Sequence, residues 1–480
     1  MRWAVGRRIP VMPRRPGVVL FAAVAIVLLA GGARRRAAPP SAADLVLDAR
    51  RSFVVTDLAI LDGFSFERVM NAIVARSGTR TTAIHLYQQL FDTQNAKPGL
   101  VAPDASHCDD FLTDGKPSFN GLPRRCPTPE GALATTNPFV SSDHIPLALI
   151  NRFDLAPVNG SNCGQYRIVF AKRSDSPFDR LHFIFEGVLP NPTPSAGIAG
   201  CRPVAEFWAD LSNVNSISER RARLDRFFFT GLDGFEPVID AGHYSAASGG
   251  GIRTMHNSGG PLRNRFYQFT LEKRGNDLLA QPDLLDNSPF GHFFDATDQT
   301  PVARRFRDAF VRNVRDLSIR DENLFFMNIP REFLLVESNP GRSETDVIFE
   351  IPFVRSLLTP EGFAFSTRIS AELLKAGSNL SSIDVVRRAQ RLSCAGCHFF
   401  RGNVGEGADA TGTAPLGVEF YQQISESFTE PGEAGPRFVI SKTMRDVFIP
   451  HRMQILQSFL KTGAPPIHGS VTIGGSRTVQ

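Results

Sequence analysis

Six cysteines constrain this chain more than any other residue type, because they fall into two kinds of surroundings. Four of them lie in stretches rich in glycine and proline: Cys108, Cys126, Cys163 and Cys201. The other two belong to "RLSCAGCHFF", residues 391–400, where they lie three positions apart and a histidine follows at once. The first set predicts structural crosslinks. The second set predicts a separate chemical role.

The first residues read as an export signal. Five arginines precede an apolar run from Val18 to Ala33, and small residues end it. The run is short for a membrane span, which needs about 20 apolar residues, and its flanks are those of a signal peptide. We therefore expect residues 1–33 to be a signal peptide and residues 34–50 a tether. An uncleaved anchor is the alternative, and only in that case would the protein be held at a membrane.

Export to the periplasm or the medium changes how the cysteines are interpreted. Thiols outside the cytoplasm are normally paired or occupied. Order along the chain suggests the disulfides Cys108–Cys126 and Cys163–Cys201, although four cysteines allow three connectivities. The last two cysteines are then left for another purpose.

The basic charge of the chain is concentrated at its start. The net charge is +5, yet residues 1–36 alone hold eight arginines and no acidic residue. The remaining residues are slightly acidic, so no basic surface predicts binding to nucleic acid.

The length of 480 residues suggests more than one domain. We expect a large mixed α/β domain of unknown function, with the disulfides, over residues 51–365. Within it, "QYRIVFAKR" and "RLHFIFEGVL" predict a β-hairpin. Residues 245–260 are rich in glycine and predict a flexible surface loop. The fold class expected for the whole chain is α+β.

The second cysteine pair follows a predicted helix. Ser381 and Asp384 predict a capping box, and apolar residues continue at helical spacing up to Cys394. The order Cys394, two small residues, Cys397, His398 is the C-x-x-C-H pattern of c-type haem attachment. Two thiols about one helical turn apart match the two vinyl groups on one porphyrin edge, and the adjacent histidine can ligate the iron.

Three other uses of this stretch compete with haem. Structural zinc usually needs four ligands, with a second pair at short spacing, and the next histidine is His451. A thioredoxin-like redox pair would stand at a helix start after a strand, whereas this pair ends a predicted helix. A plain disulfide between Cys394 and Cys397 is the third.

From about Ile383 to Thr462 the chain resembles a class I c-type cytochrome domain. The resemblance rests on the C-x-x-C-H motif and on a closing helix, "IPHRMQILQSFLKTG", with Pro450 in its first turn and Gly463 past its end. It implies a small all-α cytochrome-c-like domain over residues 366–465, followed by a flexible tail over 466–480. It also implies that Cys394 and Cys397 carry haem c, with His398 as the proximal iron ligand.

The distal iron ligand stays open at this point. The resembled family places a methionine shortly before the last helix, which suggests Met444, and His451 is the runner-up. An open distal position is the third option. The segment "MHN", residues 255–257, is the stretch of the large domain whose loop histidine and asparagine could face the haem, but a structural role is the favoured interpretation for His256, as for the other scattered histidines.

We therefore expect an exported monohaem c-type cytochrome protein that transfers single electrons to an unidentified redox partner protein. The first alternative is a haem-dependent oxidoreductase of the peroxidase or oxygenase type, with its substrate in the large domain. The second is a secreted binding or structural protein without haem.

Overall fold

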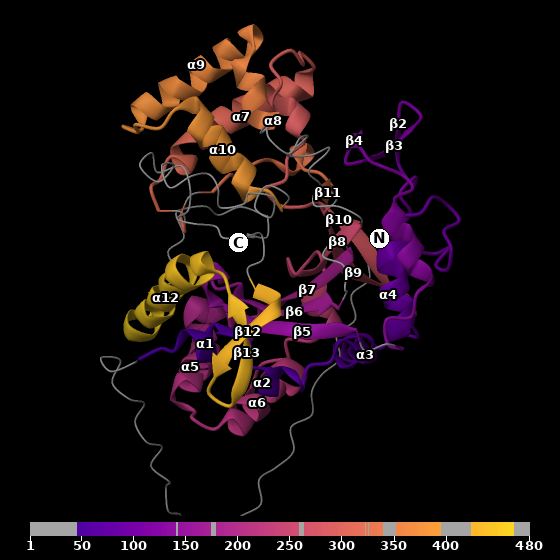
Figure 1. The fold of residues 1–480 in the computed structure, drawn as a ribbon, viewed down its shortest axis with the longest axis vertical. Coiled ribbons are helices and arrows are strands. Elements are labelled where there is room, and N and C mark those ends of the chain that lie inside the picture. The colour runs from indigo at the N-terminus through magenta and orange to yellow at the C-terminus, as the bar shows by residue number, and fades with distance from the viewer. Residues whose placement is uncertain are drawn as a thin grey trace, which may run out of the picture. The chain divides into compact units, whose positions relative to one another are not determined.

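An antiparallel sheet of eight strands organises most of the chain (Figure 1). The computed structural model describes residues 46–140, 143–173, 179–258, 264–321, 323–324, 326–338, 352–394 and 424–464. Seven strands follow one another in the order β1-β5-β6-β7-β8-β9-β10, and β11 pairs with β9. Their bounds are β1 Val54–Val55, β5 His144–Arg152, β6 Asn162–Lys172, β7 Asp179–Pro190, β8 Gly251–Ser258, β9 Asn264–Arg274, β10 Asp277–Asp283 and β11 Glu337–Ser338.

The hairpin predicted from sequence is confirmed. Strands β6 and β7 pair antiparallel, with Ile168 opposite Phe185 and Arg167 opposite Glu186. Because side chains alternate along a strand, this register sorts the two strands into one apolar and one polar face.

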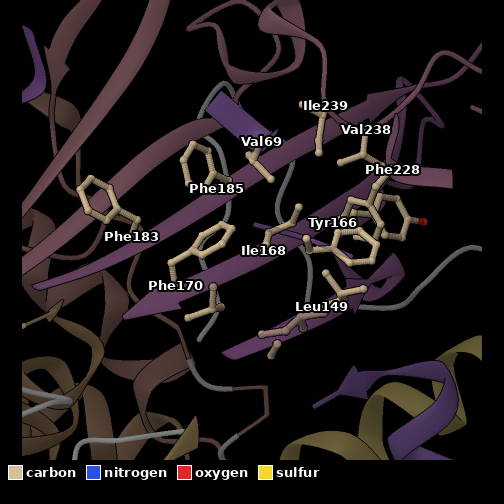
Figure 2. Packing of buried hydrophobic residues seen from close by; sticks show 14 of the residues in the cluster. Val69, Leu149, Tyr166, Ile168, Phe170, Phe183, Phe185, Phe228, Val238 and Ile239 are labelled. Atoms are coloured by element: carbon tan, nitrogen blue, oxygen red, sulfur yellow. The ribbon is translucent and has the colours of Figure 1, made fainter. Parts of the chain in front are cut away.

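The apolar face of the sheet forms the larger core. Aromatic and aliphatic side chains of β6 and β7 pack there against residues of the covering segments, and Figure 2 shows several of them together. They include Val69, Tyr166, Ile168, Phe170, Phe183, Phe185, Phe228, Val238 and Ile239. Phe66 on the covering helix meets Phe170 edge to face, with ring centroids 5.2 Å apart. We call the whole buried cluster to which these residues belong the sheet core.

Helices flank the strands and occupy the segments between them. The first group comprises α1 Ala49–Ser52, α2 Leu58–Leu61, α3 Phe66–Ser77, α4 Ala83–Asp92, α5 Arg202–Asp210 and α6 Ile217–Asp225. The second comprises α7 Pro301–Leu317, α8 Pro352–Arg355, α9 Pro360–Lys375, α10 Ser382–Leu392 and α12 Ile449–Thr462.

Helices α7, α8, α9 and α10 bury their apolar sides together in a second cluster, which we call the helical core. It contains Phe310 of α7, Phe365 of α9 and Val386 of α10. Arg388 of α10 donates hydrogen bonds to the carbonyl oxygens of Leu317 and Ile319, at 2.7 and 2.6 Å. These bonds satisfy carbonyls near the C-terminal end of α7, which have no partner within their own helix.

The small all-α cytochrome-c-like domain expected over residues 366–465 is wrong. Within that range the chain forms an antiparallel hairpin, β12 Ile424–Gly432 with β13 Gly435–Ile440. The helix before the motif and the closing helix belong to different cores: α10 lies in the helical core, and α12 places Leu456 and Phe459 in the sheet core. The described residues therefore form a large antiparallel sheet with helices and no small all-α domain.

The β12–β13 hairpin is attached to the start of the described chain. The backbone N–H of Phe438 donates to the carbonyl oxygen of Thr56 at 3.1 Å, and the Thr56 hydroxyl donates to the carbonyl oxygen of Phe438 at 2.8 Å. Arg50 forms an ion pair with Glu430 of β12 at 2.8 Å. These contacts explain why the segment before α12 belongs with the sheet.

Two disulfides are present, Cys108–Cys126 and Cys163–Cys201. This is the pairing that order along the chain suggests. The first lies beside a small three-stranded sheet formed by β2 Leu112–Thr113, β3 Lys116–Phe119 and β4 Leu122–Pro123. Disulfides are typical of exported proteins, and both fit that compartment.

The flexible loop predicted over residues 245–260 is wrong over its second half. Residues 251–258 form strand β8 in the interior of the sheet, between β7 and β9. Its side chains alternate, so that Ile252 enters the apolar face while Arg253 and Met255 point to the other.

Candidate functional site

Cys394 lies just past the end of helix α10, where the C-x-x-C-H motif begins. It is 8% exposed, and its backbone N–H donates to the Ser288 hydroxyl at 3.4 Å. The other four described cysteines form the two disulfides. Cys397 and His398, the rest of the motif, lie outside the described residues. The structure thus places the first thiol of the motif in a buried position.

Three apolar side chains surround Cys394 in a separate buried cluster. They are Met255 of β8, Phe266 of β9 and Leu285, which follows β10. We call these four residues the Cys394 cluster. Met255 and Phe266 are direct partners across the β8–β9 pair, so they project from the same face of the sheet. The motif therefore meets the sheet on the face opposite Ile168, Phe170 and Phe185.

A buried trio of charged side chains lies on that same face. Arg167 of β6 and Arg253 of β8 both contact Glu186 of β7, with N–O distances of 3.2 and 3.1 Å. The Arg167 Nε also donates to Gln165 at 2.7 Å, and Arg253 donates to Gln268 at 3.3 Å. With two guanidinium groups and one carboxylate, the trio carries a net positive charge.

Electrostatics link this trio to the motif. Burial lowers the pKa of Arg253, but Glu186, then Cys394 and Asp286, more than offset this, so its pKa lies above the ordinary value. Burial lowers the pKa of Arg167 to about 10 against the opposing effect of Glu186. Both guanidinium groups therefore remain charged at neutral pH. The positive charge of Arg253 thus interacts electrostatically with Cys394.

The structure places Met444, the first predicted distal ligand, in the sheet core. Its sulfur accepts a contact from Arg452 Nη1 at 3.7 Å. Arg452 in turn lies 3.9 Å from Asp154, which is held by Arg152 at 2.8 Å. Met444 is therefore not a member of the Cys394 cluster.

His451, the runner-up, is half-buried in the first turn of α12. Burial is the main reason that its pKa is lowered. Its Nε2 makes no hydrogen bond within the part of the chain that the structure describes.

The histidine of "MHN" has a structural partner instead. His256 projects from the face opposite Met255, and its Nδ1 lies 3.4 Å from the Glu130 carboxylate. Arg265 pairs with the other Glu130 oxygen at 2.6 Å. Burial would raise the pKa of Glu130, but His256, Thr128 and Arg265 lower it to about 2. This group is an ion-paired part of the fold.

A second histidine lies closer to the motif. His182 of β7 is the direct partner of Met255 across the β7–β8 pair, so the two share a face. Its Nε2 lies 2.6 Å from Glu426 of β12. Its buried Nδ1 makes no hydrogen bond within the described residues.

Sequence reasoning missed Arg253, Met255 and Glu186 as site residues. Two β-branched residues on one face, Ile252 and Thr254, were the available signal for a strand, and the glycines before them concealed that signal. Glu186 was placed correctly in a strand, but its two arginine partners come from neighbouring strands far apart in sequence.

The residues around Cys394 fit a covalently bound haem. A buried thiol next to a thioether, a phenyl ring and an isobutyl group offers the apolar surroundings that a porphyrin needs, and Arg253 offers a cation for a carboxylate. A group of three or more His, Cys, Asp and Glu side chains arranged for a metal is not found among the described residues. None of the described helices has the length and apolar character required to cross a bilayer.

Comparison with family models, with curated proteins and with solved structures finds no match for this chain.

Proposed function

We propose that this is an exported protein that carries one covalently bound haem and transfers single electrons to a redox partner protein. Cys394 and Cys397 would form the two thioether bonds, and His398 would be the proximal ligand. The haem would sit against the large antiparallel sheet, because the helices around the motif do not form a cytochrome-c-like domain.

The position of Cys394 is the observation that carries this proposal. Four of the five described cysteines form disulfides, whereas Cys394 is buried beside Met255, Phe266 and Leu285 at the start of the motif. A purely structural zinc site needs four ligands, and the motif itself offers three, Cys394, Cys397 and His398, so one further ligand would have to come from elsewhere. Apolar side chains and an arginine suit a large aromatic carboxylate ligand better than a hydrated metal ion.

Each residue would have a defined part. The thiols of Cys394 and Cys397 would anchor the porphyrin edge, Phe266 and Leu285 would exclude water, and Arg253 would offset negative charge. Haem supplies reversible one-electron exchange at its iron, with a potential set by axial ligation and burial. Glu186 would hold Arg253 in place through their 3.1 Å contact.

The compartment supports the same proposal. The two disulfides fit an oxidising environment, and the first 33 residues predict an export signal. We propose the periplasm as the working compartment, where c-type haem is attached and partner proteins carry electrons.

The proposal is tested by a pyridine haemochrome spectrum. The full chain is expressed with its own signal in a host that matures c-type cytochromes, and the purified protein is extracted with acidic acetone. Haem that stays with the protein and gives a c-type spectrum is the expected result. Wild-type protein without covalent haem would overturn the proposal.

Two variants sharpen this test. Replacing Cys394 and Cys397 together with alanine should abolish covalent haem, because no thiol of the motif remains. His292→Ala is the matched control, because the His292 side chain is 56% exposed and lies beside Asp298, and it should leave the haem content unchanged. Covalent haem in the double cysteine variant would contradict the assignment of the anchors.

A further inference from the structure

Helix α7 presents a basic stripe to solvent. Its apolar side enters the helical core through residues such as Phe306 and Phe310, and its opposite side carries exposed arginines. They are Arg304, Arg305, Arg312 and Arg315. Arg305 pairs with Glu332 at 3.0 Å, whereas the other three form no ion pair within the described residues. The acidic residues of α7 are Asp308 and the half-buried Asp316, so the stripe keeps an excess of positive charge.

Helix α9 presents apolar side chains to solvent. Its residues Phe365 and Leu373 fill the helical core, while Phe363 is 73% exposed and Leu374 is 82% exposed. These two side chains lie about three helical turns apart, so they project in nearly the same direction. The residues between them on the exposed side are small: Ala364, Thr367 and Ala371. Phe363 and Leu374 therefore stand out from the surface of the helix.

An ion pair joins the exposed sides of the two helices. Arg368 of α9 lies 2.6 Å from Asp308 of α7, and their side chains are 48% and 54% exposed. Asp308 belongs to the basic stripe of α7, so the stripe borders the exposed side of α9. We call Arg304, Arg312, Arg315, Phe363 and Leu374 the α7–α9 surface.

We propose that the α7–α9 surface docks on a membrane that carries anionic phospholipids. Guanidinium groups bind phosphate oxygens, and basic side chains favour binding to an anionic leaflet. Phe363 and Leu374 would enter the boundary between head groups and acyl chains, as the apolar face of an interfacial helix does. This inference goes beyond the proposed function and does not depend on the haem. It would hold the protein at a membrane without an uncleaved N-terminal anchor.

The shape of the surface favours a membrane over an acidic protein. Phe363 and Leu374 protrude from a helix whose side chains between them are small. A protein interface is closely complementary in shape, so a protein partner would need a matching pocket for each protruding side chain. A fluid bilayer needs no such pockets. Because the chain beyond residues 1–36 is slightly acidic, the basic stripe would also turn this surface toward an anionic membrane.

Co-sedimentation of the mature exported protein with lipid vesicles tests the proposal. The protein should bind vesicles of equal parts phosphatidylglycerol and phosphatidylcholine, and it should bind pure phosphatidylcholine weakly. Added salt should release it, because salt screens the attraction between arginine and phosphate. Phe363→Ser should weaken binding about 10-fold, since less apolar surface leaves water. Phe428→Ser is the matched control, because Phe428 of β12 is also 73% exposed, and it should leave binding unchanged.

Two triple variants separate docking by this surface from the effect of overall charge. Replacing Arg304, Arg312 and Arg315 together with glutamine should weaken binding to the mixed vesicles about 100-fold. The control replaces three exposed arginines outside the surface with glutamine: Arg221, Arg226 and Arg274. It changes the net charge by the same amount and should keep most of the binding. All the replaced side chains are exposed, so both variants should fold.

The outcomes are distinct. Wild-type protein that does not bind the mixed vesicles at low salt would overturn the proposal, and so would equal losses in Phe363→Ser and Phe428→Ser or in the two triple variants. Binding to both kinds of vesicle that no variant weakens would assign the contact to the N-terminal segment instead. Binding to immobilised polyglutamate but not to vesicles would assign the surface to an acidic protein. Haem content plays no part in these measurements, so their failure would leave the proposed function in place.

Discussion

Arg253 of β8 reaches across the strand pair to Glu186 of β7, and the Arg253 Nη2 lies 3.1 Å from the Glu186 Oε2. Arg167 approaches the other oxygen of the same carboxylate from β6 at 3.2 Å. One buried carboxylate therefore holds two guanidinium groups from the strands on either side. Removing one partner of a buried ion pair is costly, because the remaining charge is left in a poorly solvated site.

The first prediction follows from this arrangement. Glu186→Gln should destabilise the protein by about 3–5 kcal/mol, because two buried arginines lose their shared counter-charge while the side-chain volume is kept. Urea unfolding gives the free energy from the midpoint and slope. Glu332→Gln is the control: Glu332 is half exposed in its pair with Arg305, and exposed pairs contribute about 1 kcal/mol or less. Equal effects of the two substitutions would contradict the buried role of Glu186.

The second prediction concerns pH and Glu130. Its pKa is about 2 in the folded protein against an ordinary value of 4.5. Between these values the unfolded chain binds more protons than the folded one, so stability rises with pH. The contribution is fully present above 4.5, amounts to about 3 kcal/mol there, and is lost as the pH falls toward the folded-state value.

Thermal unfolding of wild type and Glu130→Gln over an acid series tests this directly. The glutamine variant should be the less stable protein at neutral pH, and the difference should shrink as the solution is acidified through the ordinary glutamate pKa. Since the two proteins share the other titrating groups, their difference reports Glu130 together with its partners His256 and Arg265. A difference that stays constant with pH would contradict the predicted contribution.

Local patterns in the sequence predicted local structure well. The Ser381–Asp384 capping box, the β6–β7 hairpin and the ends of α12 at Pro450 and Gly463 are all present. Each depends on residues within a few positions of one another, where one residue type satisfies one backbone requirement. The two disulfides also follow chain order.

Strand β8 shows why other elements were missed. A Cβ atom at Gly250 would collide with the carbonyl oxygens of His243 and Glu186, and one at Gly251 would lie 2.7 Å from the carbonyl oxygen of Phe269. These glycines are required by close approach of neighbouring backbones. In the sequence alone, a glycine needed for close packing looks the same as a glycine in a flexible loop.

Sequence patterns could not predict which residues α10 and α12 pack against, for a different reason. Both helices have the apolar spacing and caps that were predicted, but an amphipathic helix does not specify which surface covers its apolar face. Val386 packs in the helical core and Leu456 in the sheet core. The candidate site depends on the same kind of long-range information, since Met255 and Cys394 meet only through the fold.

The third prediction compares the two disulfides. Cys163–Cys201 closes a loop of 38 residues, and Cys108–Cys126 closes one of 18. In the chain-entropy model these loops contribute about 4 and about 3 kcal/mol, because the longer crosslink restricts the unfolded chain more. Alanine pairs at each bridge, unfolded separately in urea, should therefore rank with Cys163→Ala/Cys201→Ala as the less stable. The reverse ranking would contradict the entropic account.

The fourth prediction tests whether α12 is part of the sheet core. The ring of Phe459 lies 4.8 Å from that of Phe153 and is buried in the same core as Trp208 of α5. Phe459→Ala should destabilise the protein by about 3–5 kcal/mol through the cavity that it leaves. The loss should appear in the unfolding transition followed by the fluorescence of Trp208, because both side chains belong to one core. Phe363→Ala on α9 is the control, since this phenylalanine is 73% exposed and its removal should leave that transition in place. If α12 belonged to an independent helical domain, Phe459→Ala would leave the Trp208 transition unchanged.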